Sequence, residues 1–156
     1  MKDSTKKKLK LKVSAIKDGT VIDHIPAQNL FNVITILGLN KIDNQITFGT
    51  NLESDKLGSK AIIKVSDKFF ADDEINKIAL IAPHAKLNII RDYMVTEKRV
   101  VEVPDNVTGI VKCFNPKCIT NNEVIVTRFR VISKEPLALK CCYCEKITDE
   151  AHLKVI

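Results

Sequence analysis

The first hundred residues switch between two spacings of hydrophobic positions. Single alternation of apolar and polar residues, typical of a half-buried strand, runs over residues 9–16 and again over 45–51. Short apolar or β-branched runs predict further strands at 21–25, 60–65, 86–91 and 94–101. Helical spacing with a Gly38 end signal predicts a helix over 27–37, and a polar loop is expected at 52–58.

A second helix is predicted between the strands at 60–65 and 86–91. Asp72 or Asp73 can cap it, and Pro83 ends it. Its buried stripe consists of Ile75, Ile78, Ala79 and Ala82. The resulting order is strand, helix, strand, strand, helix, strand and one added strand. That order predicts an α+β, ferredoxin-like domain, with an antiparallel sheet and both helices on one face.

The pattern changes after residue 101. Residues 102–106 have no periodicity and contain Pro104, so a domain boundary is expected there, between domains at 9–101 and 107–156. Strands are predicted at 107–111, 123–131 and 137–140. About fifty residues of short strands bury little apolar surface, so a bound metal is expected to supply stability.

Two cysteine pairs lie in this second part. Cys113 and Cys118 form a C-x4-C pair, Cys141 and Cys144 form a C-x2-C pair, and 22 residues separate the pairs. Four thiolates from two tight loops close a tetrahedral zinc shell and leave no open position, so the zinc is predicted to be structural. The alternative is four reduced core cysteines, which rarely fall into two close pairs. Cys142 as a ligand would give a harder geometry, and it is interpreted as a free thiol. The second part is therefore expected to be a small, zinc-ribbon-like all-β domain.

Composition narrows the function. The formal charge of +6 permits nucleic acid, phosphorylated small molecules or acidic proteins as partners, although much of the excess lies in an N-terminal lysine tail. No apolar run could span a bilayer, and reduced metal-bound thiols favour the cytoplasm. The sequence contains no glycine-rich phosphate loop, and His24, His84 and His152 lie far apart. An enzyme is therefore not predicted.

Two stretches are similar to a known family. The string Gly19-Thr-Val-Ile-Asp-His-Ile-Pro-Ala-Gln28 and the cysteine loops, with Asn115-Pro-Lys-Cys-Ile119 and Leu139-Lys-Cys-Cys-Tyr-Cys-Glu-Lys146, resemble the regulatory chain of aspartate carbamoyltransferase. The resemblance implies a non-catalytic subunit of pyrimidine biosynthesis. Its N-terminal domain would bind CTP or UTP as inhibitors and ATP as an activator. Regulatory-chain homodimers would contact catalytic chains through the zinc domains.

The resemblance also implies a nucleotide site. Residues of the first strand would face the base, Asp23 and His24 would contact ribose and phosphates, and Lys98 would be the main triphosphate-binding lysine. The full implied set is Val13, Ala15, Ile16, Asp23, His24, Lys60, Lys64, Asn88, Ile90, Tyr93 and Lys98.

Residue chemistry agrees with this site without proving it. Lys60 and Lys64 are four residues apart in a predicted strand, so they share one face, and Lys98 comes from another strand. Taken alone, each lysine would more often be a solvated surface residue. The alternative function is a nucleic-acid-binding zinc ribbon, favoured by Lys112, Lys117, Arg128, Arg130 and Lys140. The absence of Trp and of interleaved aromatic residues argues against it.

Overall fold

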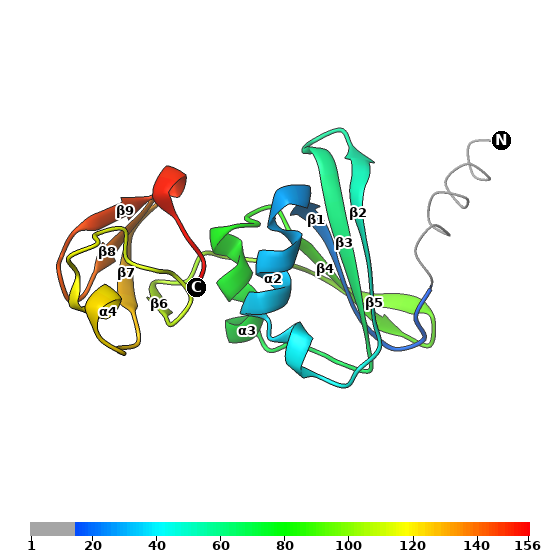
Figure 1. Ribbon diagram of the computed structural model, residues 1–156. Helices are drawn as coiled ribbons and strands as arrows, with labels where there is room; N and C mark the ends of the chain where they lie inside the picture. The colour runs from blue at the N-terminus through cyan, green and yellow to red at the C-terminus, as the bar shows by residue number, and fades with distance from the viewer. Residues whose placement is uncertain (1–14) are drawn as a thin grey trace.

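Two antiparallel sheets organise the chain. A computed structural model describes residues 15–156 (Figure 1). The first sheet has the strand order β2-β3-β1-β4-β5. Its strands are β1 (Gly19–Pro26), β2 (Ile46–Ser54), β3 (Gly58–Ser66), β4 (Lys86–Arg91) and β5 (Met94–Val100). Residues 15–101 are called here the five-stranded unit, and residues 105–156 the four-stranded unit.

Both helical segments of the five-stranded unit cover one face of its sheet, and the other face carries no helix in the described part of the chain (Figure 1). The first segment joins η1 (Ala27–Asn29) to α2 (Leu30–Ile36), and η2 (Leu39–Lys41) follows Gly38, which has a left-handed φ of 67°. The second joins α3 (Asp72–Asn76) to η3 (Lys77–Leu80). The antiparallel pairing confirms the expected α+β, ferredoxin-like arrangement.

Several predicted element boundaries were wrong. The strand predicted over 9–16 lies mostly outside the described residues, and its last two residues, Ala15 and Ile16, are not in a strand. The loop predicted at 52–58 is mainly strand, because β2 runs to Ser54 and only residues 55–57 turn. α3 is capped by Ala71 rather than by an aspartate, and Asp72 lies in its first turn. None of the described helices is both long and apolar enough to cross a bilayer.

Gly19 fixes the start of β1. Its φ of 141° lies where side chains are rarely tolerated, and an added Cβ would lie 2.1 Å from the carbonyl oxygen of Val65. The glycine therefore lets β1 and β3 approach closely at this end of the sheet.

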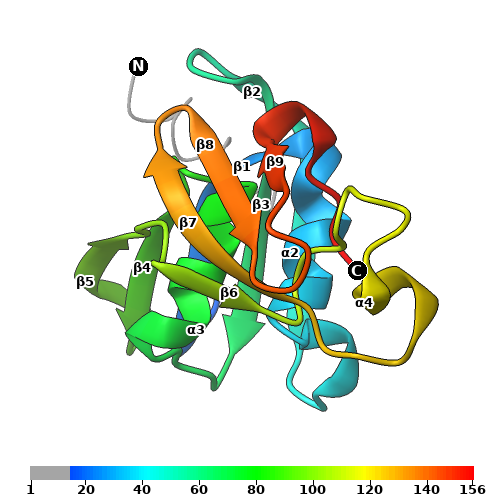
Figure 2. The same cartoon turned by 90° about the vertical axis from the view of Figure 1, so that its left-hand side faces the viewer.

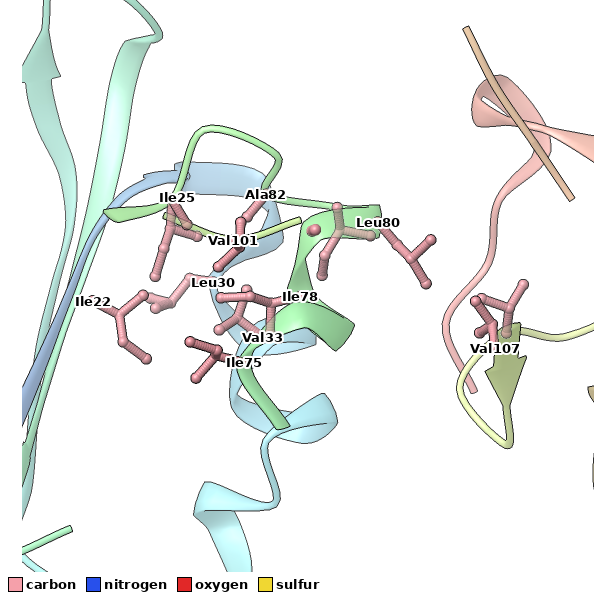
Figure 3. Close-up of a cluster of buried hydrophobic side chains, with 14 of the residues drawn as sticks. Ile22, Ile25, Leu30, Val33, Ile75, Ile78, Leu80, Ala82, Val101 and Val107 are labelled. Atoms are coloured by element: carbon pink, nitrogen blue, oxygen red, sulfur yellow. The ribbon is translucent and has the colours of Figure 1, made fainter. Parts of the chain in front are cut away.

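The core lies between the first sheet and its helices. Ile22 and Ile25 of β1 pack against Leu30 of α2 and Ile78 at the start of η3, and all four are fully buried (Figure 3). The same apolar cluster continues to Val107 in the four-stranded unit. The two units therefore share one hydrophobic core.

The helix layer lies between the two sheets (Figure 1), and Figure 2 views this stack with the second sheet nearest the viewer. The second sheet has the order β6-β7-β8-β9. Its strands are β6 (Asn106–Thr108), β7 (Arg128–Lys134), β8 (Leu137–Cys141) and β9 (Ile147–Asp149). The strand predicted over 123–131 starts later, at Arg128, because α4 (Ile119–Asn122) and a bent segment precede it. α4, β9 and η4 (Glu150–His152) were not predicted.

Candidate functional site: a four-cysteine cluster and a basic hollow

The four cysteines of the two predicted pairs come together in the four-stranded unit. The ligand atoms of Cys113, Cys118, Cys141 and Cys144 all lie within 4.8 Å of one another. The Sγ atoms of Cys113 and Cys144 are 3.6 Å apart, and those of Cys118 and Cys141 are 3.8 Å apart. A tetrahedron with zinc–sulfur bonds of about 2.3 Å has edges of about 3.8 Å. Two edges of the cluster therefore match this tetrahedron, and all four sulfurs lie close enough together to surround one metal ion.

Local hydrogen bonds hold the first cysteine loop in shape. The Asn121 side chain in α4 donates to the carbonyl oxygens of Cys113, at 2.9 Å, and Asn115, at 2.7 Å. The Cys118 N–H donates to the Asn115 carbonyl at 3.0 Å, and Cys118 is the N-cap residue of α4. The short helix α4, which was not predicted from the sequence, therefore holds this loop in shape.

The second loop follows directly from β8. Cys141 ends that strand, and the Glu145 N–H donates to its carbonyl oxygen at 3.0 Å. Glu145 takes a left-handed φ of 64°, which turns the chain back toward β9. Cys142 is exposed and its N–H donates to the Arg128 carbonyl at 2.9 Å, so it lies outside the four-sulfur cluster.

Burial controls the ionisation of these thiols. It raises the pKa of Cys113 and of Cys141. At Cys144 burial acts in the same direction, but hydrogen bonds from the Lys146 backbone, from Asn115 and from the neighbouring thiols outweigh it and lower the pKa to about 7. Metal ligation requires thiolates, so a bound dication would offset the cost of ionising buried sulfurs and would displace their protons.

The second candidate site lies on the helix-free face of the first sheet. The strand register aligns Lys64 of β3 with Val21 of β1, Val21 with Asn88 of β4, and Asn88 with Lys98 of β5. Directly paired residues project to the same face of an antiparallel sheet. The predicted Lys64 and Lys98 therefore lie in one row across four strands, on the same side of the molecule.

A β-bulge in β1 directs two further predicted residues to this face. The pairing of β1 with β3 shifts between Ile22 and Ile25, and His24 has a φ of 60°. The bulge lets Ile22 and Ile25 both reach the core although they are three residues apart. Asp23 and His24 between them line an open hollow of about 420 Å³ on the sheet surface.

Lys60 approaches the hollow as part of an ion pair. Its Nζ lies 3.0 Å from Oδ1 of Asp23, and both side chains are about one-fifth exposed. The Asp23 carboxylate also accepts the backbone N–H of His24 at 2.6 Å. The ion pair with Lys60 therefore fixes the position of the Asp23 carboxylate. A ligand that binds Lys60 would have to share this lysine with Asp23.

The imidazole of His24 is partly buried, 3.6 Å from the Asp23 carboxylate and near several lysines. Burial lowers its pKa, nearby Asp23 raises it, and Lys60, Lys86 and Lys56 lower it further. Its Nδ1 atom is buried and makes no hydrogen bond within the described part of the chain. Burial also lowers the pKa of Lys64. An anion placed here would favour the protonated forms of His24 and Lys64.

Ala15 and Ile16, which the resemblance implies face the base, lie toward the other end of the same strands, together with Ile90 and Tyr93 of the implied far wall of the pocket. Ile90 pairs with Gly19 at the start of β1, and the Tyr93 N–H donates to the Lys17 carbonyl at 2.8 Å. The segment that contains Ala15 and Ile16 therefore lies beside the turn between β4 and β5. Val13 lies outside the described residues.

Sequence reasoning missed two basic residues of the hollow. The residues that line it are Asp23, His24, Lys86, Asn88, Lys98, Arg99 and Val100. Arg99 reaches the edge of the hollow, but its guanidinium lies on the helix side of the sheet, where it donates to the Phe70 carbonyl at 3.2 Å and to Asp72, at the first turn of α3, at 3.3 Å. Lys86 could have been found from its spacing, because it is two residues before Asn88 on one strand.

Comparison with known proteins identifies the kind of protein. Two family models match, described as the aspartate carbamoyltransferase regulatory chain's allosteric domain, over residues 11–102, and its metal binding domain, over residues 105–154. Chains described as aspartate carbamoyltransferase regulatory chains are similar over nearly their full length. One from Bacteroides fragilis is 56% identical over 146 residues, covering 94% of this chain and 95% of its own. One from Pyrococcus horikoshii is 55% identical over 145 residues, covering 92% and 95%.

These matches and the two sites define a two-part regulatory protein, with an allosteric domain followed by a metal-binding domain. More specifically, the chain belongs to the family of aspartate carbamoyltransferase regulatory chains. It is a non-catalytic regulatory subunit of pyrimidine biosynthesis, as the family resemblance implied.

Proposed function

We propose that the helix-free face of the first sheet binds nucleoside triphosphates, with CTP and UTP as inhibitors and ATP as an activator. The alignment of Lys64 and Lys98 in one row across four strands carries the proposal. The hollow lies at the Asn88–Lys98 end of this row and adds Asp23 and His24, which also belong to the site that the resemblance implies. Ala15, Ile16, Ile90 and Tyr93 would form the base end, together with Val13.

The lysines supply affinity that CTP and ATP share, because both nucleotides carry a triphosphate. Ammonium groups act as point charges and impose little geometry on a phosphate. Discrimination between the nucleotides would therefore come from the size of the base and from backbone groups over residues 13–16. An effector must bind one quaternary state better than the other, or it shifts nothing.

We assign zinc to the four-cysteine cluster. Four thiolates at these spacings suit a tetrahedral, redox-inert ion, and the closed sulfur shell suits a structural role. Asn121 and the backbone around Cys141 hold the loops that would then form the partner surface. Cluster thiols of this kind are typical of a reducing compartment, so we place the protein in the cytoplasm.

The proposed assembly gives each unit its own role, as the family resemblance implies. Residues 107–156 would contact the catalytic chain of aspartate carbamoyltransferase, and residues 9–101 would bind effectors and pair with a second regulatory chain. The continuous core between the units supports coupling, because Val107 packs in the same cluster as Leu80 and Val101. Membership of this family favours the regulatory function over the nucleic-acid-binding alternative.

Copurification with the catalytic chain, followed by aspartate saturation curves with and without CTP, tests the proposal. The unmodified complex should show a CTP-dependent shift, and Lys98→Gln should reduce it. Lys41→Gln is the matched control, because Lys41 is also exposed but lies in η2 on the helix side. A saturation curve unaffected by CTP in the unmodified complex would refute the effector role. Loss of the assembled complex after chelation would support the zinc-dependent contact.

A further inference from the structure

We propose that Lys86 is a phosphate-binding residue and that it contacts the phosphate furthest from the base. This inference rests on the proposed nucleotide site and adds a residue to it. Lys86 begins β4, it is exposed, and it lines the hollow together with Lys98.

The strand register places the two lysines on one face. Lys86 and Asn88 are two residues apart on β4, and Asn88 pairs directly with Lys98. Lys86 and Lys98 are therefore diagonal neighbours across an antiparallel pair, where the separation is roughly 7–8 Å. Two ammonium groups at this spacing can meet different phosphates of one polyphosphate chain.

Two of the other cations near the hollow are already engaged by carboxylates. Lys60 is held by Asp23 at 3.0 Å, and Arg99 is held by Glu97 at 2.9 Å. Within the described part of the chain, Lys86 and Lys98 have no carboxylate within ion-pair distance. These two side chains are consequently the cations of the hollow that are best placed to meet a new anion.

The direction of the strand assigns the phosphate. By the proposed site, Ile90 lies at the base end and Asn88 lies nearer the phosphates. A strand rises by about 3.3 Å per residue, so Lys86 lies about 7 Å beyond Asn88 and about 13 Å beyond Ile90. Asp23, which pairs with Lys86 across β1 and β4, marks the same distal end. Lys86 thus extends the site toward the terminal phosphate of a triphosphate.

The placement near His24 gives independent support. Lys86 is one of the charges that act on this imidazole, and His24 lines the same hollow, with its Nδ1 atom 3.6 Å from the Asp23 carboxylate. A terminal phosphate between Lys86 and His24 could accept a hydrogen bond from both. The distal end of the hollow therefore offers a second donor beside the proposed lysine.

Calorimetric titration of the full-length chain with CTP, CDP and CMP tests this assignment. Charge-assisted hydrogen bonds are the stronger kind, so Lys86→Gln should weaken CTP binding about 5- to 10-fold. CMP binding should change less than about twofold, because CMP does not reach the distal end. Lys86→Arg should keep most of the CTP affinity, and Lys41→Gln should behave like the unmodified chain.

The outcomes separate this inference from the proposed function. If Lys98→Gln weakens CTP binding but Lys86→Gln matches the Lys41→Gln control, Lys86 is a bystander and the nucleotide site stands. Equal losses for CTP and CMP in Lys86→Gln would also overturn the terminal-phosphate assignment. If the unmodified chain binds none of the three nucleotides, the proposed function itself fails and this inference fails with it.

Discussion

Removal of the metal from the four-cysteine cluster is expected to unfold the four-stranded unit and to leave the first sheet folded. The unit is small, and its largest fully buried side chains are Phe129 and Leu139. A structural zinc in such a unit contributes about 10–16 kcal/mol near neutral pH. The net stability of a whole domain is only about 5–15 kcal/mol. The free energy lost with the ion is therefore as large as the whole free energy of unfolding of a typical domain.

Hydrogen exchange measured by mass spectrometry, before and after chelation, would resolve the two units. Amides of β7 and β8 should lose protection when the metal leaves, whereas amides of β1 and β3 should keep most of theirs. Cys141→Ser should reproduce the effect, because Cys141 is fully buried within the cluster. Cys142→Ser is the matched control and should leave both exchange and metal content unchanged. Unchanged protection of β8 after measured loss of the metal would refute the reasoning.

Three further predictions concern individual residues. Burial and the nearby lysines lower the pKa of His24, so a bound triphosphate should raise this pKa and binding should take up a proton. Triphosphate affinity should therefore increase as the pH falls from 8 toward 6. Titrations of the His24→Gln variant should lack this pH dependence. Gly19→Ala should lower the free energy of unfolding by more than about 2 kcal/mol in denaturant titration, because its Cβ would collide with the Val65 carbonyl. Thr127→Val should cost about 1–3 kcal/mol in the same assay, because the buried Val111 carbonyl loses a 2.7 Å hydrogen bond.

The five-stranded unit was largely predictable because its elements carry strong periodicity. The strands predicted at 86–91 and 60–65 correspond closely to β4 and β3. The errors arose where local polar residues suggested the wrong element. Residues 52–54 look like a loop but continue β2, because an outer strand needs little apolar content. Ala71 is the N-cap residue of α3 although it has no capping side chain. The Glu74 carboxylate supplies the capping hydrogen bond, because it accepts the Ala71 N–H at 3.2 Å.

The four-stranded unit was less predictable for a different reason. Its short elements are fixed by the cysteine loops and by side-chain hydrogen bonds, which leave no periodic pattern. α4 has only four residues and is held by Asn121 and Asn122. The four cysteines themselves were evident from spacing alone. In the basic hollow, the spacing of Lys60 and Lys64 predicted a shared face. Only the register from β3 through β1 and β4 to β5 placed Lys98 beside Asn88 and brought in Lys86.

The order of residues along β5 has a mechanical consequence. Lys98 and Arg99 are neighbours in the chain and therefore project to opposite sides of the sheet. Lys98 pairs with Asn88 and both line the hollow, whereas Arg99 donates hydrogen bonds to the carbonyl of Phe70 and the carboxylate of Asp72. Further along α3, Asn76 accepts the N–H of Glu102, where the chain crosses to the other unit. Lys98 is thus connected to the crossing point through one peptide bond, the hydrogen bonds of Arg99 to Phe70 and Asp72, and α3 with its Asn76 contact.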